Sequence, residues 1–237
     1  MARHVFAKVT TGRERHGSHS HIARHIHTTA YAALILSGGY EEAGSEGRVR
    51  TRPGDVLLHG PFDAHLDRFS DAATEILNIA LPDRLPGRGH IGRIADPDSV
   101  VRAAERDCRD AAQALFAQWQ DSTAPVRDWP DALRDHLSAT AENLAQWARI
   151  NGLAPETLSR AFGRLYGVGP AAFRAEMRAR RAWRRIVDSA LPLAAIAAET
   201  GFADQAHMTR AVTALTGAPP GRWRKSNPFK TERRRPA

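Results

Sequence analysis

An internal repeat near the C-terminus constrains this sequence more than any other feature. Residues 159–174 read SRAFGRLYGVGPAAFR, and residues 209–224 read TRAVTALTGAPPGRWR. At an offset of 50 residues the identical residues of the two segments include Arg160 and Arg210, Gly167 and Gly217, Pro170 and Pro220, and Arg174 and Arg224. The chain therefore contains two copies of one structural unit.

Each copy predicts a helix-turn-helix. The first copy has an apolar-periodic segment, ENLAQWARI, then the turn NGL and the segment APETLSRAFGRLY. The second copy has LPLAAIAAE, TGF and ADQAHMTRAVTAL. Gly152 and Gly201 stand where the first helix must end, a position that favours positive φ, and Pro155 suits the first position of the second helix. Two short helices joined by a tight glycine turn are typical of this motif.

The positive charge of the chain is concentrated in the part that contains the repeat. Residues 1–120 hold 15 Lys/Arg and 15 Asp/Glu, so the whole formal charge of +8 lies beyond them. A basic domain that carries two helix-turn-helix units favours double-stranded DNA as the partner, with the second helices entering adjacent major grooves about 34 Å apart. The alternative is a helical bundle or solenoid in which the repeats only stack, but solenoids need about three or more units.

A longer helix is predicted between the two copies, over the segment PAAFRAEMRARRAWRRIVDSA. Arg174, Arg178, Arg181 and Arg185 follow one another on it at steps of four, three and four, which gives a single basic stripe. We expect one or two of these side chains to contact phosphates and the others to be solvated.

The remaining composition bounds the cellular setting. Cys108 is the single cysteine, so the chain cannot form an internal disulfide, and a reducing compartment is expected. The N-terminal residues lack the apolar core of a secretory signal, and no apolar stretch reaches the length of about 18 residues that spans a membrane. A cytoplasmic location is the expectation.

The N-terminal half predicts strands followed by one helix. Residues 30–81 alternate short apolar runs with turn residues, which is typical of antiparallel strands. From residue 98 an amphipathic helix is expected, with Ser99 as its cap. Its apolar seam suits pairing with a second copy of the chain or packing on the protein's own sheets, and consists of Val101, Ala104, Cys108, Ala111, Leu115 and Trp119.

Residues 128–226 resemble the DNA-binding domain of the AraC/XylS family of bacterial transcription regulators. The second copy, IAAETGFADQAHMTRAVTALTGAPPGRWR, follows the family pattern closely. Met208 and Val212 replace aromatic residues of that pattern, and Ala203 replaces its serine cap. Loss of that cap predicts a cost of about 1 kcal/mol at the start of the helix.

The resemblance implies a set of DNA-facing residues on the second helix of each unit. Arginine can pair with guanine, glutamine with adenine and glutamate with cytosine. Arg160 and Arg210 could instead bind phosphates or brace the fold through salt bridges, and Glu156 could point away from the DNA. The implied set is Glu156, Thr157, Ser159, Arg160, Arg164, Gln205, Ala206, His207, Thr209 and Arg210. Leu158, Phe162, Leu165, Ile196, Phe202 and Trp223 are expected in the core.

Residues 15–85 resemble the cupin fold, a small jelly roll. The motif that carries the resemblance is His25-x-His27, followed by position 31, Gly38 and, after Gly54, His65. Tyr31 stands where cupin enzymes have a carboxylate, Phe69 where they have an asparagine, and His19 where they have a glycine. We expect His16, His19 and His21 to lie in a disordered tail.

The tyrosine at position 31 changes the chemistry that the cupin resemblance implies. Iron sites with two histidines and one carboxylate need the acid, although three histidines could hold zinc. We therefore expect neither a metal nor another cofactor, and predict that His25, His27, Tyr31 and His65 line a pocket for a small organic molecule. The alternative is a metal-dependent cupin enzyme that carries a DNA-binding tail.

The predicted protein is a two-domain, α+β transcription regulator without enzymatic activity, in which an antiparallel cupin-like jelly roll precedes an all-α domain with two helix-turn-helix units. The expected partners are promoter or operator DNA and a small-molecule effector, with room for contact with RNA polymerase and for a homodimer, and without a membrane. The predicted segments are a sensing domain at 1–95, a helix and linker at 96–127 that could dimerise, a DNA-binding domain at 128–230 and a basic tail at 231–237.

Overall fold

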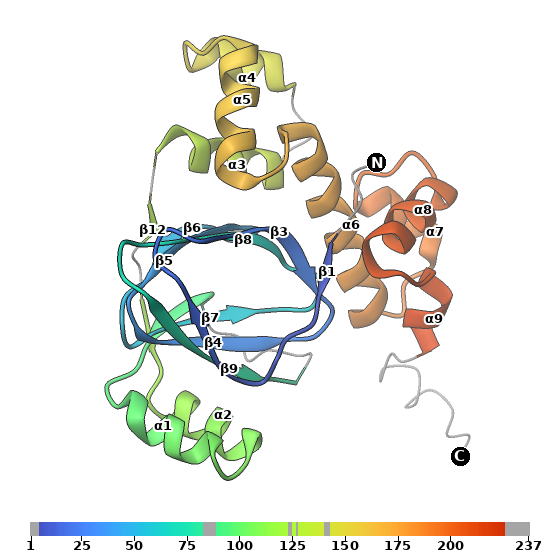
Figure 1. Ribbon diagram of the computed structural model, residues 1–237. Helices are drawn as coiled ribbons and strands as arrows, with labels where there is room; N and C mark the ends of the chain where they lie inside the picture. The colour runs from blue at the N-terminus through green and yellow to red at the C-terminus, as the bar shows by residue number, and fades with distance from the viewer. Residues whose placement is uncertain (1–4, 83–88, 123–124, 127, 140–142, 226–237) are drawn as a thin grey trace, which may run out of the picture. The chain divides into compact units, whose positions relative to one another are not determined.

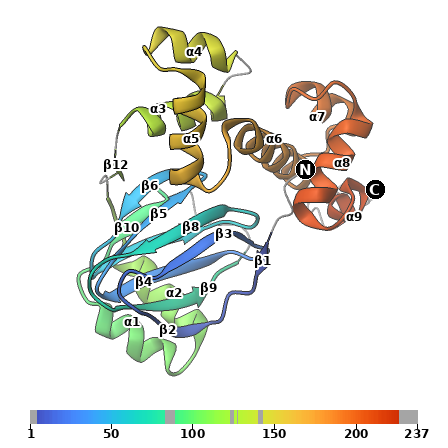
Figure 2. The same cartoon turned by 45° about the horizontal axis from the view of Figure 1, so that its top comes forward.

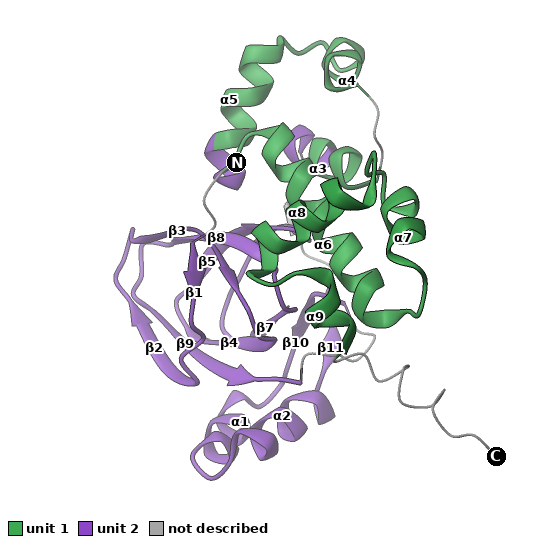
Figure 3. Cartoon of the chain, turned by 90° about the vertical axis from the view of Figure 1, so that its right-hand side faces the viewer, with its two compact units in different colours: residues 1–4, 133–163, 168–237 green, residues 5–132, 164–167 purple. Residues whose placement is uncertain are grey.

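The fold is described from a computed structural model over residues 5–82, 89–122, 125–126, 128–139 and 143–225. These residues divide into two compact units, coloured separately in Figure 3. The sheet unit comprises residues 5–132 and 164–167, and the helical unit comprises residues 133–163 and 168–225. The predicted basic tail lies outside the described residues, and the finer segment boundaries stay predictions.

The sheet unit contains two six-stranded sheets that face each other (Figure 1). The first has the strand order β1-β3-β8-β5-β6-β12 and the second has the order β11-β10-β7-β4-β9-β2. The strands are β1 (Phe6–Ala7), β2 (Gly12–His16), β3 (His21–His27), β4 (Tyr31–Ser37), β5 (Tyr40–Gly44), β6 (Gly47–Arg50), β7 (Asp55–His59), β8 (Ala64–Phe69), β9 (Thr74–Ala80), β10 (Ile91–Arg93), β11 (Gln120–Asp121) and β12 (Pro125–Val126). The predicted sheet-rich N-terminal part is confirmed, and its jelly-roll connectivity stays a prediction.

Strand β4 shows how the sequence pattern divides between the two faces of a sheet. Because successive side chains of a strand point to opposite faces, Tyr31, Ala33 and Ile35 join an apolar cluster that includes residues of both sheets. Ala32 and Leu34 belong to a second cluster, which includes residues of α1 (Pro97–Ala104) and α2 (Cys108–Ala117). One face of β4 therefore points between the sheets, and the other carries a helical layer.

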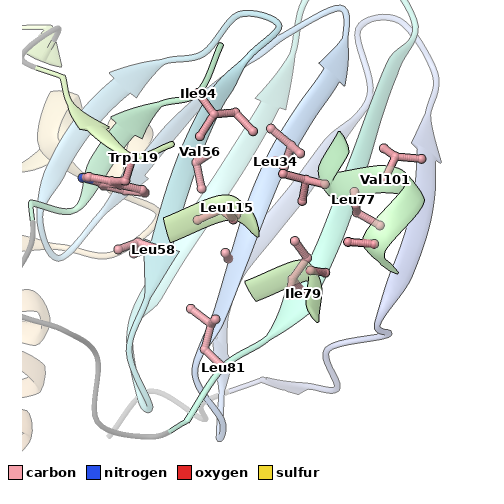
Figure 4. Packing of buried hydrophobic residues seen from close by; sticks show 14 of the residues in the cluster. Leu34, Val56, Leu58, Leu77, Ile79, Leu81, Ile94, Val101, Leu115 and Trp119 are labelled. Atoms are coloured by element: carbon pink, nitrogen blue, oxygen red, sulfur yellow. The ribbon is translucent and has the colours of Figure 1, made fainter. Parts of the chain in front are cut away.

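The apolar seam of residues 101–119 packs on the protein's own sheet. Val101, Leu115 and Trp119 are at most 8% exposed and share one cluster with residues of β4, β7 and β9 (Figure 4). Of the two interpretations of the seam, intramolecular packing is the one that the structure supports, and dimerisation is not needed to cover these side chains.

The single helix expected after residue 98 is two helices, with a turn at residues 105–107. Asp107 has extended backbone and caps α2 by accepting a hydrogen bond from the backbone N–H of Arg109 at 2.5 Å. The cap of α1 is Asp96, which accepts from the backbone N–H of Ser99 at 3.0 Å. The prediction of Ser99 as the cap was wrong because Asp96 supplies the acceptor three residues earlier.

The expectation that His16, His19 and His21 lie in a disordered tail was also wrong. Residues 12–16 form strand β2, which pairs with β9, and the ring of His16 stacks on Phe69 at 4.2 Å between centroids. His19, at the position where the cupin pattern has glycine, has a φ of 55°. The backbone there takes the left-handed conformation for which glycine is usually selected.

The helical unit contains both predicted helix-turn-helix units (Figures 1 and 2). Helix α6 contacts α7, α8 and α9. The helices are α3 (Trp129–Ala139), which begins in the sheet unit, α4 (Leu144–Ile150), α5 (Pro155–Tyr166), whose last turn also belongs to that unit, α6 (Pro170–Asp188), α7 (Leu193–Glu199), α8 (Gln205–Thr216) and α9 (Pro220–Lys225). No helix in the described ranges combines the length and apolar character that crossing a bilayer requires.

The turns of the two units have the predicted backbone geometry. Gly152, after α4, has a φ of 66°, and Gly201, after α7, has a φ of 77°. Both values lie in the left-handed region that glycine enters without steric cost. Helix α5 begins at Pro155, and the predicted long helix is α6.

Helix α8 is capped, although the sequence pattern predicted that it would lack a cap. Asp204 has extended backbone, and its Oδ1 accepts a hydrogen bond from the backbone N–H of His207 at 2.6 Å. Ala203 lies one residue before the cap and is exposed. The prediction was wrong because the acceptor is supplied by the next residue.

Replacing Asp204 with alanine should destabilise the helical unit by about 0.5–2 kcal/mol, because it removes the cap acceptor of α8. The matched control is Ala203→Ser, which should change the free energy of unfolding little while Asp204 holds the cap. Chemical denaturation of both variants measures the difference. If Ala203→Ser stabilised the unit by as much as Asp204→Ala destabilised it, the assignment of Asp204 as the cap would be contradicted.

Three arginines of the basic stripe bind groups of their own unit. Arg178 donates to the carbonyl of Gly201 at 3.3 Å, Arg181 donates to the carbonyl of Ser138, and Arg185 pairs with Glu199 at 2.9 Å. These side chains tie α6 to its neighbours, so the expectation that arginines without a phosphate contact are solvated was wrong for them, and the phosphate contacts stay a prediction.

The predicted core of the helical unit is mostly correct. Leu158, Phe162, Ile196 and Phe202 are buried, whereas Leu165 and Trp223 are half-buried. Trp223 lies in an edge-to-face contact with Trp183 at 5.8 Å, and its ring N–H donates to Thr216 at 2.9 Å. This polar partner is what a partly exposed indole requires.

Candidate functional site

The second helix of each helix-turn-helix unit presents a polar face to solvent. On α5, Leu158 and Phe162 are buried one turn apart, so the side chains between them project outward. On α8, Met208 and Val212 have the same role. Of the predicted DNA-facing residues, His207 and Thr209 are half-buried and the others are exposed, namely Glu156, Thr157, Ser159, Arg160, Arg164, Gln205, Ala206 and Arg210.

Arg160 and Arg210 occupy equivalent positions on the two helices. Arg160 donates from Nε to the carbonyl of Glu156 at 3.4 Å, within its own helix. Within the described part of the chain neither arginine has an ion-pair partner, and both are exposed. The interpretation that they brace the fold through salt bridges is therefore not supported, and base or phosphate contact stays a prediction.

The sheet unit brings together the four residues predicted to line a pocket. His25 pairs with His65 across β3 and β8, and Tyr31 Oη lies 3.3 Å from His65 Nε2. The ring of His27 lies 4.7 Å from that of His25 and 4.8 Å from that of Tyr31. All four line one cavity of about 160 Å³, a volume comparable to cavities that hold a benzene-sized molecule.

These four side chains are neutral at pH 7. Burial lowers the pKa of His27 to about 4, with a further contribution from His25. Burial also lowers the pKa of His25, and it lowers that of His65 well below its usual value. The pKa of the Tyr31 phenol is raised well above its usual value by burial and then by the negative charge of Glu42. The cavity therefore offers hydrogen bonds without a formal charge on these groups.

Hydrogen bonds fix the tautomers of two of the histidines. A carbonyl oxygen can only accept, so Nδ1 of His25 donates to Ala23 at 2.9 Å and Nδ1 of His27 donates to Ala7 at 3.1 Å. Each ring then carries its lone pair on Nε2. Such a backbone partner is the usual support of a histidine that binds a ligand or a metal.

Sequence reasoning did not assign three polar residues between the sheets to a site. Glu42 on β5 is 2% exposed, and His59 on β7 is 1% exposed. Glu42 Oε2 lies 3.4 Å from His59 Nε2, and Glu42 Oε1 lies 3.4 Å from Nε2 of His90, which precedes β10. The period-two pattern places Glu42 on the same face as Tyr40, and His59 on the same face as Leu57, but it could not indicate which strands become neighbours.

The carboxylate of Glu42 and the ring of His90 shift each other's protonation. Burial raises the pKa of Glu42, and the hydrogen bond from His90 partly offsets that rise. Burial lowers the pKa of His90, but the hydrogen bond and charge of Glu42 outweigh it, so the pKa ends above its usual value.

Among the residues that the structure describes, two overlapping sets of side chains could hold a metal ion. His25, His27 and His65 form one set, and Glu42, His59 and His65 form the other. In each set one candidate ligand atom per residue lies within 4.8 Å of the others. The first set is the histidine part of the cupin pattern and lacks a carboxylate, because position 31 is tyrosine.

Residues 147–226 match the protein family described as helix-turn-helix domain. The arabinose operon regulatory protein of Escherichia coli (strain K12) is 24% identical over 164 residues, which are 69% of this chain and 53% of that protein. Its namesake in Salmonella typhimurium is 29% identical over 99 residues, which are 42% of this chain and 35% of that protein. The chain therefore spans about half the length, or less, of these curated relatives.

Among solved structures, the chain is similar to ToxT from Vibrio cholerae O395. It is 12% identical, with a TM-score of 0.40, and the match covers 92% of this chain and 98% of ToxT.

Proposed function

We propose that this chain, which carries an AraC-type helix-turn-helix domain over residues 147–226, is a transcription regulator that binds specific double-stranded DNA and responds to a small molecule. The observation that carries the proposal is the pair of helix-turn-helix units, each with an exposed polar face on its second helix. The names of the curated relatives, arabinose operon regulatory proteins, support it.

DNA binding would use the exposed faces of α5 and α8. Arg160, Arg210 and Gln205 carry donors that match the edges of guanine and adenine in the major groove. Two units in one chain can contact two successive segments of an operator without a partner protomer. At a promoter such a protein contacts or excludes RNA polymerase. A homodimer is no longer required by the apolar seam, which is buried within the sheet unit.

The effector would occupy the cavity lined by His25, His27, Tyr31 and His65. Its small volume and its uncharged polar groups favour a small organic molecule with one or two hydrogen-bonding groups. With Nδ1 bonded to the backbone, His25 and His27 can only accept through Nε2, whereas the Tyr31 phenol can donate and accept, so the cavity suits an uncharged compound that brings a hydrogen-bond donor.

A metal-dependent enzyme is the second candidate, because the three cupin histidines converge in the structure. The tyrosine at position 31 weighs against it, since non-haem iron oxygenases use two histidines and one carboxylate. Oxygen consumption by the iron-loaded protein, dependent on an added organic compound, would favour the enzyme.

Selection of bound fragments from genomic DNA tests the proposed function. The full chain should enrich a small set of fragments, and footprinting on them should show two protected segments about one helical turn apart. Binding without enrichment of any sequence would contradict the regulator and indicate a nonspecific DNA-binding protein.

Tyr31→Phe should weaken the response to the effector while DNA affinity in its absence stays the same. The substitution removes the phenol that lies 3.3 Å from His65 and leaves the ring in place. Thermal unfolding against a library of small organic compounds measures binding, because a compound at about 100 times its Kd stabilises the fold by about 2.7 kcal/mol. His21→Gln, at an exposed position of the facing sheet, is the control. Equal shifts in both variants would place the effector elsewhere.

A further inference from the structure

Glu42 is a buried carboxylate in a cluster of imidazoles. It lies on β5, 2% exposed, with His59 and His90 on its two oxygens. Within the described residues its Oε2 accepts no hydrogen bond. A buried anion in this state costs several kcal/mol unless a cation neutralises it.

The distances around Glu42 are those of ligands that share an ion. A hydrogen bond between nitrogen and oxygen spans about 2.7–3.2 Å, whereas Oε2 lies 3.4 Å from His59 Nε2. In a tetrahedral site with metal–ligand bonds of about 2.0–2.1 Å, neighbouring ligand atoms lie roughly 3.4 Å apart. The Glu42–His59 pair is thus long for a hydrogen bond, as is the pair of Glu42 and His90, and it matches the spacing of one edge of a metal site.

His65 completes a set of three around this edge. One ring nitrogen of His65, one of His59 and one oxygen of Glu42 all lie within 4.8 Å of one another, and all three residues are buried. Nδ1 of His65 has no hydrogen-bond partner in the described part of the chain. Small side-chain rotations would close this set onto an ion.

We propose that Glu42, His59 and His65 bind a divalent first-row transition metal ion between the two sheets. Two histidines and one carboxylate are a set that holds zinc and ferrous iron in proteins. Glu42 and His59 lie outside the motif that resembles cupins, so the carboxylate comes from a strand where that pattern has none. The proposal goes beyond the regulator function and does not depend on it.

Charge favours this set over the three cupin histidines. His25, His27 and His65 are all neutral, so an ion among them would keep its full double charge in a buried site. Glu42 supplies one negative charge, which lowers the cost of burying a dication. Because both sets need His65, they compete for one ion.

His90 is a positioning residue for Glu42. Its Nδ1 donates to the carbonyl of Leu58 at 2.7 Å, and its Nε2 lies 3.4 Å from Glu42 Oε1. The other oxygen, Oε2, is thereby turned toward His59. Loss of such a support typically lowers metal affinity about 10- to 100-fold without abolishing binding.

Titration of the full chain with Co²⁺, after dialysis against a chelator, tests the site. The wild type should bind one ion and show the visible absorption of cobalt in a four- or five-coordinate site. Glu42→Gln and His59→Gln should each lose this absorption, and His90→Asn should shift the titration midpoint about 10- to 100-fold. His27→Gln removes a ligand of the competing set and should leave the cobalt absorption and the titration midpoint unchanged.

Circular dichroism of the metal-free variants shows whether each one is folded, and only folded variants are compared. Two results overturn the proposal. One is a wild type that binds no cobalt, and the other is loss of cobalt binding in His27→Gln, which would place the ion among the cupin histidines. Because the titration uses neither DNA nor an effector, its failure would leave the regulator function untouched.

Discussion

Replacing Leu115 with alanine should lower the free energy of unfolding of the sheet unit by about 2–5 kcal/mol. Leu115 is 0% exposed and lies in one apolar cluster with Val56 and Leu58 of the sheet beneath α2 (Figure 4). Removing three carbon atoms there leaves a cavity that the sheet cannot close. Chemical denaturation followed by far-ultraviolet circular dichroism measures the change.

The matched control is Gln113→Ala, which lies on the same helix at an exposed position and should change stability by less than about 0.5 kcal/mol.

Leu115→Glu separates the two interpretations of the apolar seam, which are pairing with a second copy and packing on the chain's own sheet. A folded, soluble monomer would show that the seam pairs with a second copy of the chain, whereas loss of the folded state is expected from a charge buried against the sheet.

The helical unit was largely predictable because its signals are local. The spacing of apolar residues defines each helix over a few turns, and glycine at positions 152 and 201 marks the turns through a backbone preference of its own. The repeat then supported each assignment with a second copy. The error at the start of α8 was equally local, since the pattern pointed to Ala203 and the cap was supplied by Asp204.

For the sheet unit, the sequence could predict the presence of strands and the grouping of the motif histidines, but not which strands lie next to one another. His25, His27 and His65 could be grouped because a known spacing connected them. Glu42 and His59 could not, since their proximity depends on which strands become neighbours across the two sheets. Strand register is a long-range property, and alternation within a strand gives the face of a residue without giving its partner.

The sequence contains a signal for the break between α1 and α2, but the apolar periodicity around it pointed to one continuous helix. Asp107 is a good capping residue just before Cys108, but the apolar steps on either side continue the helical period. The structure keeps that period by folding the two helices onto one sheet face, so Val101 and Leu115 still meet the same cluster. Periodicity identified the buried residues correctly and placed the helix boundary wrongly.

Arg160→Ala and Arg210→Ala should each weaken binding to the selected operator by roughly 1–3 kcal/mol, which is about 5- to 150-fold in Kd. The two side chains are exposed at equivalent positions of α5 and α8, and neither has an ion-pair partner among the described residues. If each contacts a guanine, footprinting should show that each variant loses one protected segment and keeps the other. The double variant should lose about the sum of the two free energies, because distant contacts add.

Arg149→Ala is the control, because it removes the same charge from an exposed position on α4, away from both second helices. Binding measured at several salt concentrations separates the two kinds of contact. A lost phosphate contact lowers the slope of log K against log salt by about 0.9 and weakens all sequences alike. A lost base contact instead reduces discrimination at one position of the operator. If both arginine variants behave like Arg149→Ala, or if the footprint spans a single segment, the two-unit mode of DNA binding is wrong.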